Sequence, residues 1–390
     1  MVRQDKTIAY LDGIRGVAAL GVFLNHFSLA FYPAWNTLKP ELSHLDGLEI
    51  AYTHSILSFL NSGTFYVSVF FVLSGYVLSH KYFSSNDVEA LISGLFRRFL
   101  RLFMPITFVI ILSYILLMSH LYFNDPVSQI SMSNWFSNLW HIGNPTRLLF
   151  ENILYGSSLF VGVASFDTCL WTMSWEFYGS LFVFTFLLFT HFTKRFQLPM
   201  LLLPMVYFFI MKQPLYEDML LGMTLFYIEQ KVKNSGGIVT NLLAIVLLPL
   251  SLALASVPFV GPLPGTWQEA VKNNIWDYTP WCAGVTAYFL VVVFVLSPFL
   301  QRIANLKPLA FLGYISFSLY LLHPILIGSF GSWLFLKVYD GSNYNESVLI
   351  SFVAMIPVLI VCSWLMAKYV DQFGIRFAKK VYGIVRNATP

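Results

Sequence analysis

Apolar segments of about twenty residues recur from one end of this chain to the other. A segment of that length can cross the hydrocarbon core of a bilayer as an α-helix. The composition agrees, because 57% of the 390 residues are hydrophobic and only 11% are charged, whereas roughly a quarter of a soluble domain is charged. A transmembrane β-barrel would instead show short strands of alternating polarity. The sequence therefore predicts an all-α polytopic membrane protein, and it contains no long polar stretch that could form a separate soluble domain.

Ten segments are predicted to cross the membrane, and both termini then lie on the same side because ten is an even number. The segments are 9–32, 55–80, 99–120, 168–191, 197–212, 214–230, 239–257, 277–299, 308–336 and 347–370. With that side in the cytoplasm, most of the 23 lysines and arginines fall in inner segments, as the positive-inside rule requires. The first segment lacks a signal-peptide cleavage site, so it is expected to remain as a span. We expect a multi-pass protein of the plasma (inner) membrane with both termini in the cytoplasm.

The first predicted span carries three ionisable side chains, Asp12, Arg15 and His26. Arg15 and His26 are eleven positions apart, so in a helix they face almost the same direction, roughly 16 Å apart along the axis. Such groups are costly in a bilayer and usually face the bundle interior for a functional reason. The alternatives are an anchor or an ion pair with Asp12 for Arg15, and a hydrogen-bonded core histidine for His26. Histidine is the side chain best suited to act as a general base near neutral pH.

Two motifs lie toward the predicted inner side. Ser74 and Gly75 are small, which allows a neighbouring helix or a ligand to approach closely. Arg97 and Arg101 are one helical turn apart and share a face, with Arg98 beside them. Guanidinium groups bind phosphates bidentately, so this motif suits a phosphate-bearing ligand. The alternative interpretations are plain helix packing for the small residues and positive-inside anchoring for the arginines.

Two further motifs place polar groups inside predicted spans. Glu176 enters the membrane from the outer side, where an isolated carboxylate is costly and needs either a function or a buried cation as its partner. Ser316, Tyr320 and His323 follow an i, i+4, i+7 spacing and therefore share one helix face. Pro324 frees a backbone carbonyl in the preceding turn. This face is either the polar wall of a cavity or a packing kink.

The cysteines and the long outer loops are less informative. Cys169, Cys282 and Cys362 are far apart and form no metal-binding or redox spacing, so we expect buried apolar side chains and no metal site. The outer loops 33–54 and 121–167 contain aromatic residues beside polar ones. This mixture suits stacking on sugars, and it equally suits the aromatic belt at a membrane surface.

Taken in order, these motifs resemble those of the acyltransferase-3 family, which are integral membrane O-acyltransferases that act mostly on carbohydrates. The motifs that carry the resemblance are Asp12-Gly13-x-Arg15-Gly16 with His26, Phe70-Phe71-x-x-Ser74-Gly75, Arg97-Arg98-x-x-Arg101-x-x-x-Pro105, Leu170-Trp171-Thr172-Met173-x-x-Glu176 and Leu319-Tyr320-Leu321-x-His323-Pro324. The resemblance covers residues 8–375 and leaves 376–390 as a short basic cytoplasmic tail. This chain departs from the family at Asp371, where members often have a Glu-Lys-Pro type sequence.

The resemblance implies a donor, an acceptor and a set of site residues. The donor would be acyl-CoA, by default acetyl-CoA, used from the cytoplasm as a co-substrate and not as a bound cofactor. The acceptor would be a hydroxyl of a carbohydrate or glycoconjugate; the lipid bilayer is the other partner, and no nucleic acid or metal is expected. The implied catalytic residues are His26, Arg15, Glu176, Tyr320 and His323. The implied donor-binding residues are Arg97, Arg98, Arg101, Ser74 and Gly75. The implied structural or orienting residues are Asp12 and Ser316.

In the expected mechanism His26 takes the proton of the acceptor hydroxyl, which attacks the thioester. Glu176 would orient His26 or the sugar, and Tyr320 would stabilise the oxyanion. The alternative function is a secondary transporter, because buried charges and broken helices also suit a carrier. The sequence shows no inverted repeat, which favours the enzyme.

Overall fold

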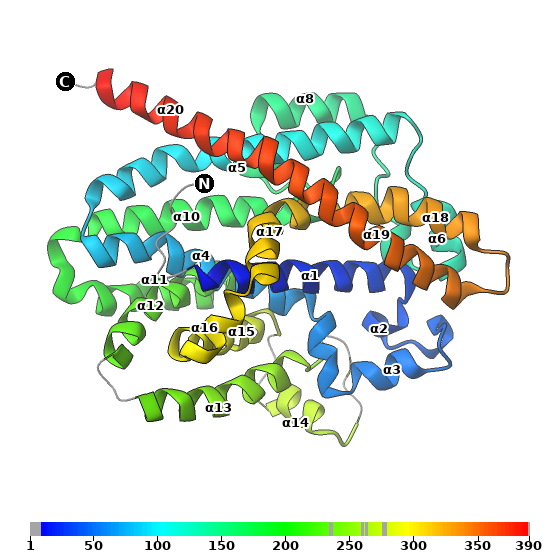
Figure 1. Cartoon of the computed structure of the whole chain (residues 1–390), viewed down its shortest axis with the longest axis horizontal. Helices are drawn as coiled ribbons and strands as arrows, with labels where there is room; N and C mark the ends of the chain where they lie inside the picture. Colours follow the sequence, from blue (N-terminus) through cyan, green and yellow to red (C-terminus); the bar gives the residue numbers. More distant parts are fainter. Residues whose placement is uncertain (1–8, 234–236, 259–260, 262–263, 275–278, 389–390) are drawn as a thin grey trace.

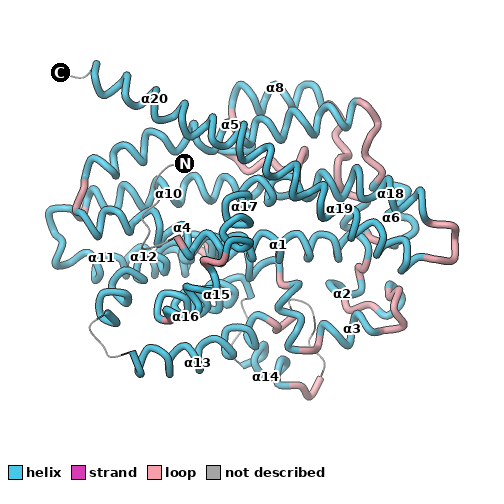
Figure 2. Tube along the Cα trace, viewed as in Figure 1, coloured by secondary structure: helices cyan, strands magenta, loops and turns pink. Residues whose placement is uncertain are grey.

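The computed structural model describes residues 9–233, 237–258, 261, 264–274 and 279–388. Every regular element within these ranges is a helix (Figure 1, Figure 2), so the all-α prediction is confirmed. The longer helices are α1 (Tyr10–Phe31), α4 (Gly63–Ser85), α5 (Val88–Met118), α10 (Trp171–Phe189), α11 (Gln197–Ile210), α12 (Pro214–Lys233), α13 (Gly237–Ala255), α15 (Thr279–Leu296), α17 (Lys307–Leu326), α19 (Tyr344–Met366) and α20 (Gln372–Ala388). The shorter ones are α2 (Ala34–Thr37), α3 (Leu48–Thr53), α6 (Asn124–Ser131), α7 (Asn134–Ser137), α8 (Pro145–Tyr155), α9 (Ser157–Phe160), α14 (Trp267–Asn274), α16 (Pro298–Ala304) and α18 (Ser332–Val338). Arg3 and Lys6, which belong to the cations expected in the cytoplasm, lie outside the described residues.

Six of the described helices are long and apolar enough to span a membrane. They are Tyr10–Phe31, Gly63–Ser85, Val88–Met118, Thr168–Phe189, Lys307–Val338 and Tyr344–Asn387. A seventh span results if α15 and α16, which are bent by 101° relative to each other, count as one. Each of the ten predicted segments is helical over most of its length, but the number ten is not confirmed. The helix α11 has only 14 residues, and α12 carries Glu217, Asp218 and Glu229, which is more charge than a typical span has.

Large apolar side chains remain exposed on the outward faces of several helices. Examples are Leu203 on α11, Ile245 on α13 and Leu349 on α19, which are 75%, 68% and 61% exposed. A soluble monomer rarely exposes apolar patches of this extent, whereas a lipid-facing surface requires them. The fold is therefore that of a multi-pass membrane protein.

Figure 1 shows the first turn of α1 and the last turns of α20 toward the left of the molecule, with α2, α3 and α6 on the right. The chain thus begins and ends nearer the same end of the bundle. Residues 376–388, predicted as a basic tail, form most of α20, which packs along α5. This segment continues α19 through a short π-helical stretch at Ala367–Asp371 and is not an irregular tail.

Helix α1 lies at the centre of the bundle, packed mainly against α17 on one side and α4 on the other. Close approach of α1 and α17 depends on glycine. A β-carbon at Gly16 would lie 2.6 Å from the backbone nitrogen of Gly313, so only hydrogen fits there. Because the two helices cross so closely, the C-terminal half of α1 runs beside the segment of α17 that carries Tyr320 and His323.

Candidate active site

Two histidines from distant parts of the chain meet at the α1–α17 contact. His26 Nδ1 lies 2.8 Å from His323 Nε2, and the two rings stack with centroids 5.0 Å apart. His323 is fully buried, whereas His26 is half-buried. The sequence predicted both as site residues but gave no sign that they bond to each other.

The hydrogen bonds fix the tautomers of both rings when they are neutral. His323 Nδ1 lies 3.1 Å from the carbonyl oxygen of Leu319, which can only accept, so Nδ1 of His323 carries the proton. His323 Nε2 is then the acceptor, and His26 Nδ1 donates to it. The lone pair of His26 consequently lies on Nε2, which is the nitrogen available to take a proton from another molecule.

Trp135 covers the other face of His26. Its indole stacks on the imidazole with centroids 5.2 Å apart and an angle of 26° between the ring planes. Trp135 lies on the short helix α7, whose neighbouring Phe136 is fully buried. Ser133, the N-cap of α7, ties this helix to α1 through a 2.6 Å hydrogen bond from its hydroxyl to the carbonyl of Leu29. Sequence reasoning missed this role, because a tryptophan in an outer loop is equally typical of the interfacial belt.

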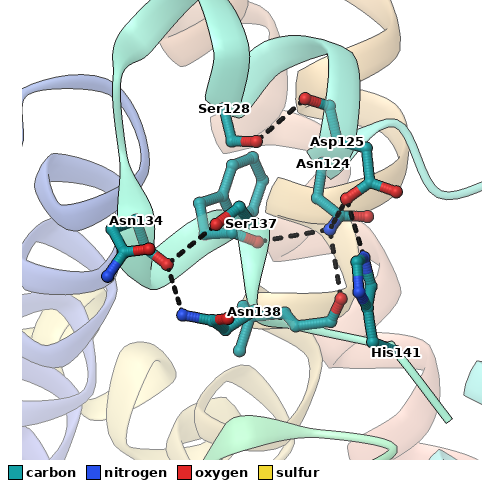
Figure 3. Close-up of polar contacts among 9 residues, drawn as sticks. Asn124, Asp125, Ser128, Asn134, Ser137, Asn138 and His141 are labelled. Carbon is teal, nitrogen blue, oxygen red and sulfur yellow. Dashed lines mark hydrogen bonds and ion pairs between the residues drawn. The ribbon is translucent and has the colours of Figure 1, made fainter.

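A network of side-chain amides holds the loop that carries Trp135 (Figure 3). The buried Asn124 donates from Nδ2 to the carbonyls of Phe136 (3.2 Å) and Leu139 (3.1 Å). Asn138 Nδ2 donates to the carbonyl of Asn134 at 2.7 Å, which closes the turn around α7. The indole of Trp135 is therefore presented to His26 by a loop fixed at several points.

A cavity of about 410 Å³ opens beside His26. Its lining combines polar side chains with two large indoles. The lining side chains used below are Asn25, His26, Thr64, Trp171, Trp175 and Tyr320. The Tyr320 hydroxyl donates to Thr172 Oγ1 (2.9 Å), because the proton of Thr172 goes to the carbonyl of Cys169 (2.9 Å). Ser316, expected on the same face, bonds to the carbonyl of Gly313 within its own helix (2.8 Å).

Glu176 lies in a second polar cluster and not beside His26. One of its carboxylate oxygens pairs with Arg98 and accepts a 3.0 Å hydrogen bond from the Ser74 hydroxyl. Arg98 also donates from Nε to Ser180 Oγ at 2.8 Å. In the expected mechanism Glu176 orients either His26 or the sugar. The first of these roles needs correction, since His323 and not Glu176 contacts His26. Arg98 is likewise a buried ion-pair partner and is not a free phosphate ligand.

The other predicted cations stay accessible. Arg101 is exposed and Arg97 is half-buried, with its Nε bonded to the carbonyl of Ser93 at 3.0 Å. Arg15 lies 3.5 Å from Asp12 across one turn of α1, and both side chains are about one-fifth exposed, at 21% and 22%. Asp371 lies close enough to Arg101 to interact with it electrostatically. Arg15 and Arg101 are thus the predicted donor-side cations that combine charge with access.

Gly75 belongs to a helix crossing. A β-carbon at Gly75 would lie 1.9 Å from the carbonyl oxygen of Met219, so α4 and α12 touch backbone to backbone there. Of the two interpretations of Ser74 and Gly75, the geometry supports helix packing for Gly75 and places Ser74 on Glu176.

Gly75→Ala is expected to destabilise the protein by about 1–3 kcal/mol, as overpacking of a dense core typically does. The thermal denaturation temperature in lipid nanodiscs should fall while the KM for the donor stays unchanged. Gly383→Ala is the matched control, because a β-carbon there has nothing within 4 Å. Unchanged stability with a raised donor KM would restore the donor-binding role.

Cys169 completes the immediate surroundings of the histidine pair. Its Sγ lies 3.9 Å from His26 Nδ1 and 3.8 Å from His323 Nε2, and the side chain is fully buried. The preceding Asp167 accepts the amide proton of Cys169 at 2.7 Å. Burial raises the pKa of Asp167 to about 8, since the charged carboxylate is poorly solvated there. Spacing along the sequence gave no hint of this cluster.

A histidine with a free ring nitrogen beside a cavity, inside a multi-pass helical bundle, suits a membrane-embedded enzyme. The family model of the acyltransferase-3 family, described as an acyltransferase domain, matches residues 8–368. The chain therefore belongs to this family and is an O-acyltransferase. It is 25% identical over 427 aligned positions to the O-acetyltransferase PaAT-1 of Phomopsis amygdali, covering 96% of this chain and 84% of that protein. No solved structure gives a significant match.

Proposed function

We propose that this protein transfers an acyl group, by default acetyl, from acyl-CoA to a hydroxyl of a carbohydrate or glycoconjugate. The observation that carries the proposal is the pair of His26 and His323, which leaves Nε2 of His26 as the base beside a cavity of about 410 Å³. The name of the relative, an O-acetyltransferase, supports acetyl as the group.

His26 acts as the general base in this proposal. Its Nε2 takes the proton of the acceptor hydroxyl, and the oxygen attacks the thioester carbonyl carbon. The bond between that carbon and the CoA sulfur then breaks, and the proton passes from His26 to the leaving thiolate. The bond to His323 holds the imidazole in the required tautomer, and the face of Trp135 stabilises the positive charge that His26 gains. Tyr320 lines the same cavity. Its hydroxyl donates to Thr172 in this structure, so in the proposal it turns from Thr172 to donate to the developing oxyanion.

The acceptor would lie in the cavity. Trp171 and Trp175 offer apolar faces, while Asn25 and Thr64 offer hydrogen-bonding groups. Sugars combine apolar ring faces with hydroxyls, so this lining supports a carbohydrate acceptor.

The donor would approach from the end of the bundle that carries Arg15, Arg97 and Arg101, where phosphates find accessible guanidinium groups. His26 and Arg15 lie on the same helix, eleven residues apart, so the thioester can reach along α1 toward the base. We place this end, and both termini, in the cytoplasm of a plasma (inner) membrane protein, as the distribution of lysine and arginine favours.

The test is release of CoA from acetyl-CoA by the purified protein in nanodiscs, with and without a panel of glycosides. We expect release that depends on the acceptor, and a product heavier by one acetyl group. If acetyl-CoA neither binds nor reacts, the proposed donor is wrong. The transporter alternative would then be tested by flux of small polar metabolites into liposomes.

Arg101→Gln is expected to raise the KM for acetyl-CoA about 10-fold with little change in kcat, since a charge-assisted hydrogen bond is worth about 1.5–3 kcal/mol. Steady-state kinetics at fixed ionic strength measures this. Arg147→Gln is the matched control, because Arg147 is an exposed cation on α8 that pairs with Glu151 and belongs to none of the motifs expected to bind the donor. An unchanged KM in Arg101→Gln would remove Arg101 from the donor site.

A further inference from the structure

Three side chains that bind metals strongly meet behind the cavity. The ligand atoms of His26, Cys169 and His323 all lie within 4.8 Å of one another. The individual separations are 2.8 Å between the two ring nitrogens and 3.8–3.9 Å from each nitrogen to the sulfur. Among the residues that the structure describes, this is the only group of three such side chains.

These separations suit a single ion. Zinc bonds lie at about 2.0–2.1 Å to imidazole nitrogen and about 2.3 Å to thiolate sulfur. A tetrahedral ion with those bonds imposes edges of about 3.3 Å between the nitrogens and about 3.6 Å from each nitrogen to the sulfur. The two ring nitrogens would therefore have to separate by about half an ångström, and the sulfur would have to approach each of them by about 0.3 Å. The ligand set of two imidazoles and one thiolate is one that selects zinc and its softer neighbours over magnesium or calcium.

The surroundings supply the remaining features of a metal site. His323 Nδ1 is bonded to the carbonyl of Leu319, which is the kind of outer contact that orients a metal-bound histidine. His26 borders the cavity, so a fourth ligand such as water has space on that side. Three protein ligands with one open position is an arrangement that zinc adopts in proteins where the ion remains accessible, in contrast to the closed four-ligand structural sites.

We propose that the cluster of His26, Cys169 and His323 binds a zinc-class divalent ion, and that the bound ion inhibits the enzyme. The inhibitory part rests on the proposed function, because it requires His26 to be the base. Binding replaces the hydrogen bond between the two histidines by two bonds to the ion. The Cys169 thiol loses its proton to solvent and binds as a thiolate. The proton on Nδ1 of His26 moves to Nε2, which frees Nδ1 to bind the ion. Because Nε2 of His26 then carries a proton, it can no longer act as the base.

The binding experiment needs no enzyme activity, so its outcome is independent of the proposed function. Protein stripped with a chelator is titrated with Co²⁺, whose bond to a thiolate gives a near-ultraviolet charge-transfer absorption, and the ion is then displaced with Zn²⁺. The Cys282→Ala/Cys362→Ala variant leaves Cys169 as the only thiol of the three. We expect the absorption in wild type and in this variant, and its loss in Cys169→Ala.

Cys169→Ala should also weaken zinc binding by more than about 100-fold, since even outer-shell partners are typically worth 10–100-fold in affinity. Absence of the absorption in the Cys282→Ala/Cys362→Ala variant, checked to be folded by its thermal denaturation temperature, overturns the site even if Cys169→Ala does not fold. Absorption that persists in Cys169→Ala also overturns it.

Inhibition is measured in the same preparations. CoA release by stripped wild type should fall as Zn²⁺ is added and return with chelator. In Cys169→Ala, inhibition relative to that variant's own metal-free rate should require about 100-fold more Zn²⁺. Binding without inhibition would retain the site and overturn its inhibitory role, and loss of activity on stripping would do the same.

Discussion

His26→Ala is expected to lower kcat for acyl transfer by about 10²–10⁴-fold, the usual contribution of a general base. The donor KM should change little, because the accessible cations expected to hold acyl-CoA lie on other turns and helices. The measurement is CoA release from acetyl-CoA in nanodiscs, with acceptor present. The effect is large because His26 is the only imidazole among the described residues that line the cavity.

The control for this substitution is His120→Asn. His120 is exposed and has a positive φ of 55°, a conformation that asparagine tolerates. The His120→Asn variant should release CoA at the wild-type rate. Turnover near the wild-type rate in His26→Ala would show that His26 is not the base, and the search would move to another group lining the cavity.

Glu176→Ala is expected to destabilise the protein by about 3–5 kcal/mol, the typical consequence of leaving a buried partner charge uncompensated. Arg98 is only 7% exposed and Glu176 is 16% exposed. Removing the carboxylate leaves the guanidinium inside the bundle with Ser180 as its remaining side-chain partner in the described structure. The free energy of unfolding in mixed detergent and lipid micelles, or the thermal denaturation temperature, measures the loss.

Two further variants make the charge-pair result specific. Arg98→Met/Glu176→Leu should be less destabilised than Glu176→Ala, because no charge is left unpaired. Glu151→Ala is the matched control: its pair with Arg147 lies at the surface, where such pairs contribute about 0–1 kcal/mol. If Glu176→Ala is no less stable than Glu151→Ala but loses kcat, Glu176 is part of the chemistry and the structural interpretation fails.

These two variants separate the two clusters that the fold builds. The histidine cluster lies at the α1–α17 contact, and the arginine–glutamate cluster joins α5, α10 and α4. His26→Ala should mainly lower the rate of acyl transfer, and Glu176→Ala should mainly lower the stability of the protein.

The sequence by itself determined the features that depend on local periodicity and hydropathy. Helices form where apolar runs occur, because a backbone in lipid must satisfy its own hydrogen bonds. The spacing of 3.6 residues per turn places Arg15 and His26 on one side of α1, and Tyr320 and His323 on one face of α17. The motifs also sufficed to indicate the family, since their order along the chain is itself informative.

Only the tertiary structure decided which polar groups meet. His26 and His323 are 297 residues apart, and Arg98 and Glu176 are 78 apart. Pairing at such separations depends on how helices cross, and those crossings are set by contacts such as Gly16 against Gly313. The position of Glu176 in an apolar segment predicts that its carboxylate is costly to bury and therefore needs a partner. This cost does not depend on which residue the partner is, so the sequence alone does not identify Arg98.

The same reason explains why Trp135 and Cys169 escaped the sequence analysis. An aromatic loop residue and an isolated cysteine each have ordinary explanations, and nothing local marks them as neighbours of His26. Stacking and metal-ligand distances are properties of three-dimensional packing, so they arise only when α7, the turn Thr168–Leu170 and α17 pack around the C-terminal half of α1.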